Sequence, residues 1–299
     1  MRPDRAAEPA HWYSTNLVGV ATPVLASAAF NAHPVPLRIA GTREAHAGLF
    51  ALLERSADLS EAQDMFGHYL EIAFGLRPAP PEACLAEQRR WRASYIKLLQ
   101  GWGLDANSGS GAVLKGWVES RFGLVPTFHR DPLGHFPSPA WIRYLEEKAA
   151  SRYHNNCIQQ QLDLLYEFCQ WTLLRFNPLA ALGAQAEGPW VRLWRGSNRA
   201  EEQLVDGELH RPTRTRPPRR SGEPQASRAS RRVTMRLNNL VSFALDREGA
   251  SCFGDWVFEA RAPLCKLLFY PGLLPRRILG GEGELLVIGG NFELEASYE

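Results

Sequence analysis

The chain has 299 residues with a formal net charge of +2 at pH 7, and 45% of its residues are hydrophobic. These values favour a globular protein of one large domain or two smaller ones, with a sizeable core. No apolar run reaches the roughly 18 residues that a membrane-spanning helix needs, and the N-terminus lacks the apolar segment of a signal peptide.

The cysteines and histidines show no pattern that is typical of a metal site. The five cysteines form no CxxC pair and are odd in number, and the eight histidines form no HExxH motif. Disulfides are rare in the reducing cytoplasm, where thiols stay free. We therefore expect a cytoplasmic protein with buried thiols and without a metal.

The first 180 residues are predicted to be mainly helical. Residues 16–40 contain three prolines and indicate extended or short helical structure. Start signals then predict helices over 42–55, 60–74, 80–99 and 111–121, and another from 138. The clearest predicted helix spans 153–176, where apolar residues recur every three or four positions until Asn177-Pro178 ends it.

The remaining residues, 181–299, are predicted to be rich in β-strands. Alternating or apolar runs indicate strands over 190–196, 237–245, 255–260, 266–270, 276–279, 284–288 and 291–298. Gly289 and Gly290 are expected to end the strand before them. The sequence therefore predicts an α+β protein, with a helical region 1–180 packed on a β-rich core 181–299.

An arginine- and proline-rich segment, residues 207–232, interrupts this β-rich part. Residues 211–232 contain eight arginines and a single acid, Glu223. The segment is too polar to pack, so we expect a mobile, disordered insertion. The alternatives are a steering patch for an acidic partner and a nucleic-acid-binding segment. No aromatic residues lie between the arginines, which argues against nucleic acid.

Three short motifs with chemical potential occur in the β-rich part. They are Arg195-Gly196 at a predicted strand end, Ser242-Phe243 within a strand, and Glu282-Gly283-Glu284 between a glycine loop and a strand. In an extended chain, residues two apart point to the same side, so Glu282 and Glu284 can face one reacting centre. Each motif alone is weak. Together they resemble the arginine–serine–glutamate signature of the arginine-modifying ADP-ribosyltransferases.

The resemblance extends further, because the whole chain is similar to the dinitrogenase reductase ADP-ribosyltransferase family of nitrogen-fixing bacteria. Its most distinctive segments are residues 14–20, 30–39, 113–124 and 154–163. The resemblance implies an ADP-ribosyltransferase-like split β-sheet core and transfer of ADP-ribose from NAD to one arginine of dinitrogenase reductase, the nitrogenase iron protein. It also implies release of nicotinamide, a block of nitrogenase, and a PII-type signalling protein as regulator.

The residue types agree with this chemistry. An arginine fork bonds phosphate oxygens with a geometry that lysine cannot match, so Arg195 is expected to hold the NAD pyrophosphate. Gly196 is expected to let the backbone approach the nicotinamide amide. Ser242 is suited to support the active-site glutamate or a ribose hydroxyl, and Phe243 to pack against nicotinamide.

The two glutamates are assigned different roles. Cleavage of the nicotinamide–ribose bond develops positive charge on the ribose, as in glycoside hydrolysis. A fixed carboxylate stabilises this charge, and Glu284 at the strand is the candidate. The acceptor guanidinium is normally cationic and a poor nucleophile. Glu282 on the loop is therefore expected to orient it and to assist its deprotonation.

The sequence departs from the family pattern at two places, and three alternative functions stay open. Ala244 stands where the family often has a second hydroxyl, which puts the hydrogen bond to the glutamate in doubt. Glu293-Leu294-Glu295 is a second Glu-x-Glu, discounted because no glycine loop precedes it.

The alternative functions are an ADP-ribosyltransferase with another target, an NAD glycohydrolase, and a non-catalytic binding protein.

Overall fold

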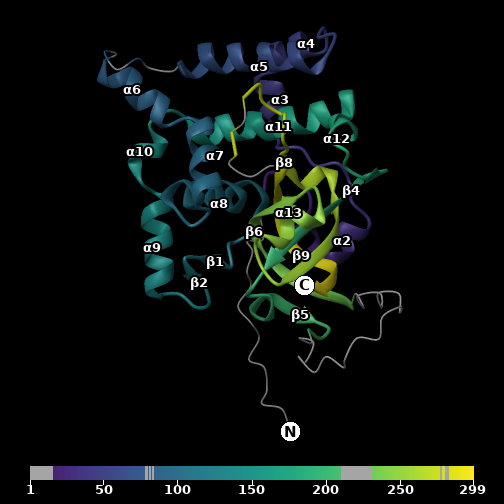
Figure 1. The fold of residues 1–299 in the computed structure, drawn as a ribbon. Helices are drawn as coiled ribbons and strands as arrows, with labels where there is room; N and C mark the ends of the chain where they lie inside the picture. The colour runs from purple at the N-terminus through teal and green to yellow at the C-terminus, as the bar shows by residue number, and fades with distance from the viewer. Residues whose placement is uncertain are drawn as a thin grey trace.

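The computed structural model describes residues 16–77, 80, 82, 84–209, 231–276, 278–279 and 283–299. Most of the helices precede residue 182, and the strands of the main sheet follow it (Figure 1). This arrangement confirms the predicted α+β class. Buried apolar side chains from both parts form one continuous core, from Val18 to Ala296.

Helices of 4 to 19 residues fill the N-terminal part. They are α1 (Thr22–Leu25), α2 (Ala28–Ala32), α3 (Thr42–Ala45), α4 (Ala47–Leu53), α5 (Leu59–Phe74), α6 (Leu85–Arg92), α7 (Tyr95–Leu104), α8 (Gly109–Phe122), α9 (Pro139–Lys148), α10 (Ser151–His154), α11 (Ile158–Phe176) and α12 (Pro178–Ala181). The predictions for α5, α8 and α9 are confirmed.

Three helices predicted from the sequence differ in the structure, because two of them are divided and one begins later. The predicted 42–55 helix is two helices, because the backbone of His46 leaves the helical conformation. The predicted 80–99 helix breaks at Ala93, and Ser94 caps a new helix, α7, by accepting a hydrogen bond from the Lys97 backbone N–H. The predicted 153–176 helix begins only at Ile158, because Cys157 has a left-handed backbone, with φ of 50°.

The main sheet is antiparallel in every pairing, with the order β3-β4-β7-β9-β6-β5. Its strands are β3 (Ala186–Glu187), β4 (Trp190–Ser197), β5 (Leu204–Asp206), β6 (Arg231–Ala244), β7 (Trp256–Pro263), β8 (Leu267–Phe269) and β9 (Glu284–Tyr298). A separate hairpin joins β1 (Phe128–His129) and β2 (Asp131–Pro132), and a short helix, α13 (Arg247–Ser251), follows β6.

The longest strand, β9, has different neighbours at its two ends. Its first half pairs with β8 and its last residues with β7, while β6 pairs along nearly all of it. The expectation that Gly289 and Gly290 end this strand is therefore wrong. The two glycines sit instead at an irregularity in the β6–β9 register, where a Cβ on Gly289 would lie 1.7 Å from the Asn238 carbonyl oxygen.

Two other β-sheet expectations need correction. Among the described residues of the predicted 276–279 strand, none is in a strand. The predicted 207–232 insertion ends too late, because Arg231 and Arg232 already belong to β6 and pair with Ala296 and Glu295. Residues 210–230, the bulk of that insertion, lie outside the described residues.

The buried helix α11 joins the two parts of the fold. Figure 1 shows it between the α4–α5 layer and the sheet. Its Tyr166 hydroxyl donates to the Cys265 carbonyl at 2.7 Å, and its Gln170 amide donates to the Leu267 carbonyl at 2.8 Å. On the other side, the rings of Phe168 and Phe66 stack with centroids 4.1 Å apart. The position of the helices relative to the sheet is thus fixed by buried contacts.

A buried lysine ties the N-terminal segment to the glycine irregularity of β9. Lys266 is fully buried, and its Nζ donates to the Leu25 carbonyl at 2.9 Å and the Gly289 carbonyl at 3.0 Å. The rings of Phe30 and Phe292 lie 5.3 and 5.2 Å from Nζ. Burial lowers the pKa of Lys266 to about 7.

We predict that Lys266→Met lowers the free energy of unfolding at pH 9 by about 2–4 kcal/mol, because two buried carbonyl oxygens lose their donors. Between its folded pKa of about 7 and its ordinary value of 10.5, the unfolded chain binds a proton that folded Lys266 has released. The free energy of unfolding of the wild-type protein therefore rises with pH between these two pKa values. The variant has no titrating group at this position, so its free energy of unfolding rises less. Urea unfolding at pH 7 and pH 9 measures both effects. An equal loss at the two pH values would contradict the prediction.

Candidate active site

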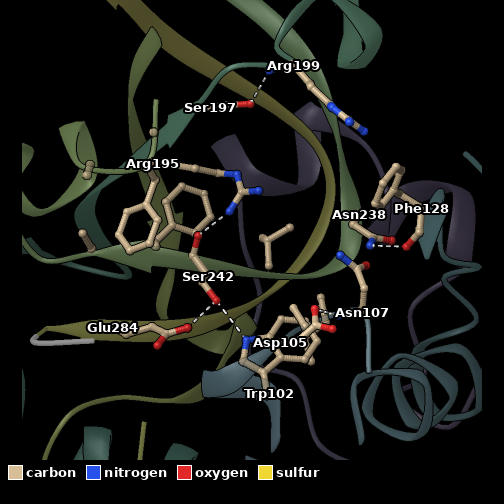
Figure 2. A pocket seen from close by; sticks show the side chains of 18 of the residues that line it. Trp102, Asp105, Asn107, Phe128, Arg195, Ser197, Arg199, Asn238, Ser242 and Glu284 are labelled. Carbon is tan, nitrogen blue, oxygen red and sulfur yellow. Dashed lines mark hydrogen bonds between the residues drawn. The ribbon is translucent and has the colours of Figure 1, made fainter. Parts of the chain in front are cut away.

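A cavity of about 710 Å³ lies between the helical part and the sheet. One wall is formed by β4, β6, the start of β9 and the α13 region. The opposite wall is formed by the end of α7, the loop to α8, and the β1 region. Figure 2 shows side chains from both walls directed toward this space. The volume is in the range of a site for a sizeable small molecule.

The structure brings most of the residues proposed from the sequence to this cavity. Arg195, Gly196, Ser242, Phe243 and Glu284 all line it. Glu282 lies outside the described residues. Glu293 and Glu295, the discounted pair, are exposed on β9 and are not among the residues that line the cavity. The cation, the hydroxyl and one of the two carboxylates therefore share one site.

Arg195 extends from β4 toward the backbone of β6. One terminal nitrogen of its guanidinium donates to the Ser242 carbonyl at 2.7 Å, as Figure 2 shows. Its Nε is buried and has no hydrogen-bond partner among the described residues. Burial lowers the pKa of Arg195, but an arginine remains cationic at neutral pH. A buried donor on a fixed cation needs an acceptor, and an oxyanion such as a phosphate can supply one.

Ser242 connects the helical part to the carboxylate of Glu284. Its hydroxyl donates to Glu284 Oε1 at 2.6 Å and accepts from the Trp102 indole N–H at 2.9 Å (Figure 2). Ala244, directly opposite Glu284 in the β6–β9 pairing, has no hydroxyl. The hydrogen bond to the glutamate, which was in doubt because position 244 has no hydroxyl, is made by Ser242. The carboxylate is thereby held in one orientation.

Two residues differ from their expected surroundings. A Cβ on Gly196 would lie 2.0 Å from the Ala250 carbonyl oxygen, so the glycine is required for β4 to pack against α13. Phe243 is only 2% exposed, and its ring lies 6.2 Å from that of Phe292 in the core. Phe253, which also lines the cavity, is 70% exposed. It therefore offers far more aromatic surface to a ligand than Phe243.

A second chain of polar contacts begins in the helical wall, at residues that line the cavity. Lys115 is buried, and its Nζ bonds Asn107 Oδ1 and the Phe128 carbonyl, both at 3.1 Å. The same Nζ lies 3.3 Å from Nδ1 of His129, whose Nε2 lies 2.9 Å from Glu147 Oε2. Burial lowers the pKa of Lys115 to about 7 and also lowers that of His129. The wall behind the cavity thus contains a connected set of titratable groups.

Trp102 and Lys115 were not found from the sequence. Both belong to the helical region, where no pattern indicated which surface is functional. The partner of Trp102 is distant in the chain, whereas the partners of Lys115 lie 8 to 14 positions away. The Trp102–Ser242 bond spans 140 positions. Within the described ranges, no group of three or more His, Cys, Asp or Glu side chains is placed to hold a metal ion, and no helix is long and apolar enough to cross a membrane.

The site thus combines a fixed arginine fork with a hydroxyl-supported carboxylate in one cavity, as an enzyme that cleaves a phosphate-bearing glycoside requires. Comparison with known proteins agrees. The family model for dinitrogenase reductase ADP-ribosyltransferase (DRAT) matches residues 15–296. The chain is also 47% identical, over 289 residues, to the NAD(+)–dinitrogen-reductase ADP-D-ribosyltransferase of Rhodospirillum rubrum, covering 96% of this chain and 95% of the relative.

The chain therefore belongs to the dinitrogenase reductase ADP-ribosyltransferase family, which confirms the resemblance found in the sequence. No solved structure matches the chain. The family is established by sequence, and the geometry of the cavity is a separate observation.

We predict that Trp102→Phe lowers kcat about fivefold to tenfold and changes the KM for NAD little. The ring is kept, but the N–H that orients the Ser242 hydroxyl is lost, at a cost of about 1 kcal/mol. The measurement is a double-mutant cycle with Ser242→Ala. In the Ser242→Ala background, Trp102→Phe should change kcat less than about twofold. A loss of the same size in both backgrounds would show that Trp102 acts through packing alone.

Proposed function

We propose that the protein transfers ADP-ribose from NAD to an arginine of dinitrogenase reductase and releases nicotinamide, which switches off nitrogen fixation. One observation supports this most strongly: Arg195, Ser242 and Glu284 meet in a single cavity. The name of the relative specifies NAD, ADP-ribose and dinitrogen reductase for that protein. We further propose, from the family resemblance, that a PII-type signalling protein regulates the activity.

NAD fits the charge and the shape of the cavity. Arg195 would bond the pyrophosphate through the guanidinium donors that the Ser242 carbonyl does not use, including the unpartnered Nε. Arg199 and Arg130 also line the cavity and add positive charge around the phosphates. The backbone of Gly196 lies beside Arg195 and is our candidate to contact the nicotinamide amide.

The aromatic partner of nicotinamide is proposed to be Phe253 in place of Phe243. Both line the cavity, but the ring of Phe243 is engaged in the core with Phe292. The exposed ring of Phe253 can stack on a planar heterocycle without any rearrangement of the core. Phe243 then has a structural role beneath the sheet surface.

Glu284 is the proposed catalytic carboxylate. The hydroxyl of Ser242 holds one oxygen, so the other can face the ribose carbon where positive charge develops. A charge that is oriented before the reaction stabilises the transition state without reorganisation, an effect of about 3–4 kcal/mol for comparable groups. Glu282, outside the described residues, remains our proposal for the acid that orients the acceptor guanidinium and assists its deprotonation.

The fold supports a split sheet of the ADP-ribosyltransferase kind. The evidence is that β9 pairs with β8 at its first half and with β7 at its end. We propose that residues 181–299 form the NAD-binding core and residues 1–180 the helical region, and that the protein works in the cytoplasm without a metal. No described feature favours nucleic acid as a partner.

The decisive experiment is incubation of the protein with labelled NAD and purified dinitrogenase reductase, followed by mass analysis. We expect one added ADP-ribose on an arginine of the acceptor. Glu284→Gln should lower kcat by about two to three orders of magnitude, whereas the matched variant Glu295→Gln should retain transfer. Label found only as free ADP-ribose would identify an NAD glycohydrolase. Loss of transfer in Glu295→Gln, with full transfer in Glu284→Gln, would reverse the assignment of the two acids.

A further inference from the structure

Two exposed residues at the end of α7, Leu104 and Asp105, form part of the helical wall of the cavity. Leu104, the last residue of α7, is 90% exposed, and Asp105, which follows it, is also exposed. Both line the cavity. A single exposed leucine is ordinary on a protein surface, but this one stands at the entrance of the site. The proposed roles of the NAD-binding residues use neither side chain.

The position of Asp105 relative to the reaction centre follows from α7. Trp102, three residues earlier, donates to Ser242, which in turn bonds Glu284. Three residues advance an α-helix by about 4.5 Å, so Asp105 lies about one helical turn beyond the side chain that reaches the catalytic pair. Figure 2 shows Asp105 beside Trp102, on the side of the cavity opposite Arg195. An acceptor that binds at Asp105 is therefore close to Glu284.

The carboxylate of Asp105 is oriented, and it lies at the end of a helix and near the buried cation Lys115. Its Oδ1 accepts a hydrogen bond from the Asn107 backbone N–H at 2.8 Å, which fixes the side chain. Asp105 caps the C-terminus of α7, the end at which the helix dipole is negative. The nearby cation Lys115 is held by Asn107 and the Phe128 carbonyl. Among the described residues, no group donates a hydrogen bond to Oδ2, so this oxygen is available to a ligand.

The two walls differ in the charge that they offer. The sheet wall presents Arg195, which repels a second guanidinium. On the helical wall, Arg130 is paired with Glu147 at 2.9 Å, and burial lowers the pKa of Lys115 to about 7. An incoming arginine is cationic and is stabilised best where an acid meets it. Three described acids line the cavity: Glu284 is engaged by Ser242, Glu202 lies on the 3-10 helix Glu201–Gln203 before β5, and Asp105 lies on the helical wall at the end of α7. The acceptor therefore has a distinct path into the site, along the end of α7.

We propose that Leu104 and Asp105 form the docking edge for the acceptor protein. Asp105 pairs with the guanidinium of the arginine to be modified, and Leu104 packs against an apolar side chain next to that arginine. This inference rests on the proposed transfer to a protein arginine. It adds that the helical region selects the acceptor, whereas the sheet binds the donor.

The test compares Leu104→Ser and Asp105→Asn with two matched variants on α5, Ile72→Ser and Asp64→Asn. Ile72 is 80% exposed and Asp64 is exposed, and neither lines the cavity. The rates are measured with dinitrogenase reductase as the varied substrate, and NAD affinity is measured by titration. We expect the KM for the acceptor to rise at least tenfold in each edge variant, while the Kd for NAD changes less than twofold. Asp105→Glu should recover most of the acceptor affinity.

Three results would overturn the inference: an unchanged KM for the acceptor in both edge variants, an equal rise in the α5 variants, or a parallel loss of NAD affinity. Failure of the proposed function is a different result, because the wild-type protein would then transfer no ADP-ribose at all. If the wild type transfers ADP-ribose and the edge variants behave like it, only the docking edge is refuted.

Discussion

The geometry of the proposed active site depends on one hydroxyl group. Ser242 has a single proton to donate, and the Trp102 N–H occupies an acceptor position of its oxygen, so the proton is directed to Glu284. The three residues come from α7, β6 and β9. A carboxylate on β9 is thus positioned by a helix that lies far away in the sequence. The helical part and the sheet therefore form the cavity together, and they share one continuous core.

The sheet meets this requirement through a local irregularity. At Gly289 and Gly290 the β6–β9 register shifts, and Gly290 adopts a φ of 114° that few other residues tolerate. The Ala26 carbonyl accepts from the Asn291 backbone N–H at 2.8 Å, which brings the N-terminal segment against the strand. The first half of β9 can therefore hold Glu284 in the cavity while its second half completes the sheet with β7.

The sequence was informative wherever the chemistry is local. Arg195, Ser242 and Glu284 stand in short motifs whose order is recognisable, and the long apolar pattern of α11 predicted its helix. It was uninformative where a distant partner decides the outcome. Nothing near Trp102 indicates that its N–H meets Ser242, and a lysine such as Lys266 is expected to be exposed until its carbonyl partners are known. The glycine pair of β9 was misread for the same reason: a local signal cannot distinguish a strand end from a bulge that the neighbouring strand accommodates.

The most direct measurement is a crystal structure of the Glu284→Gln variant with NAD. We predict the pyrophosphate within hydrogen-bond distance of the Arg195 guanidinium, the nicotinamide ribose beside residue 284, and nicotinamide against the ring of Phe253. The Asp105 side of the cavity should remain open for the acceptor. A dinucleotide bound outside this cavity, or one whose ribose lies away from residue 284, would contradict the assignment of the site.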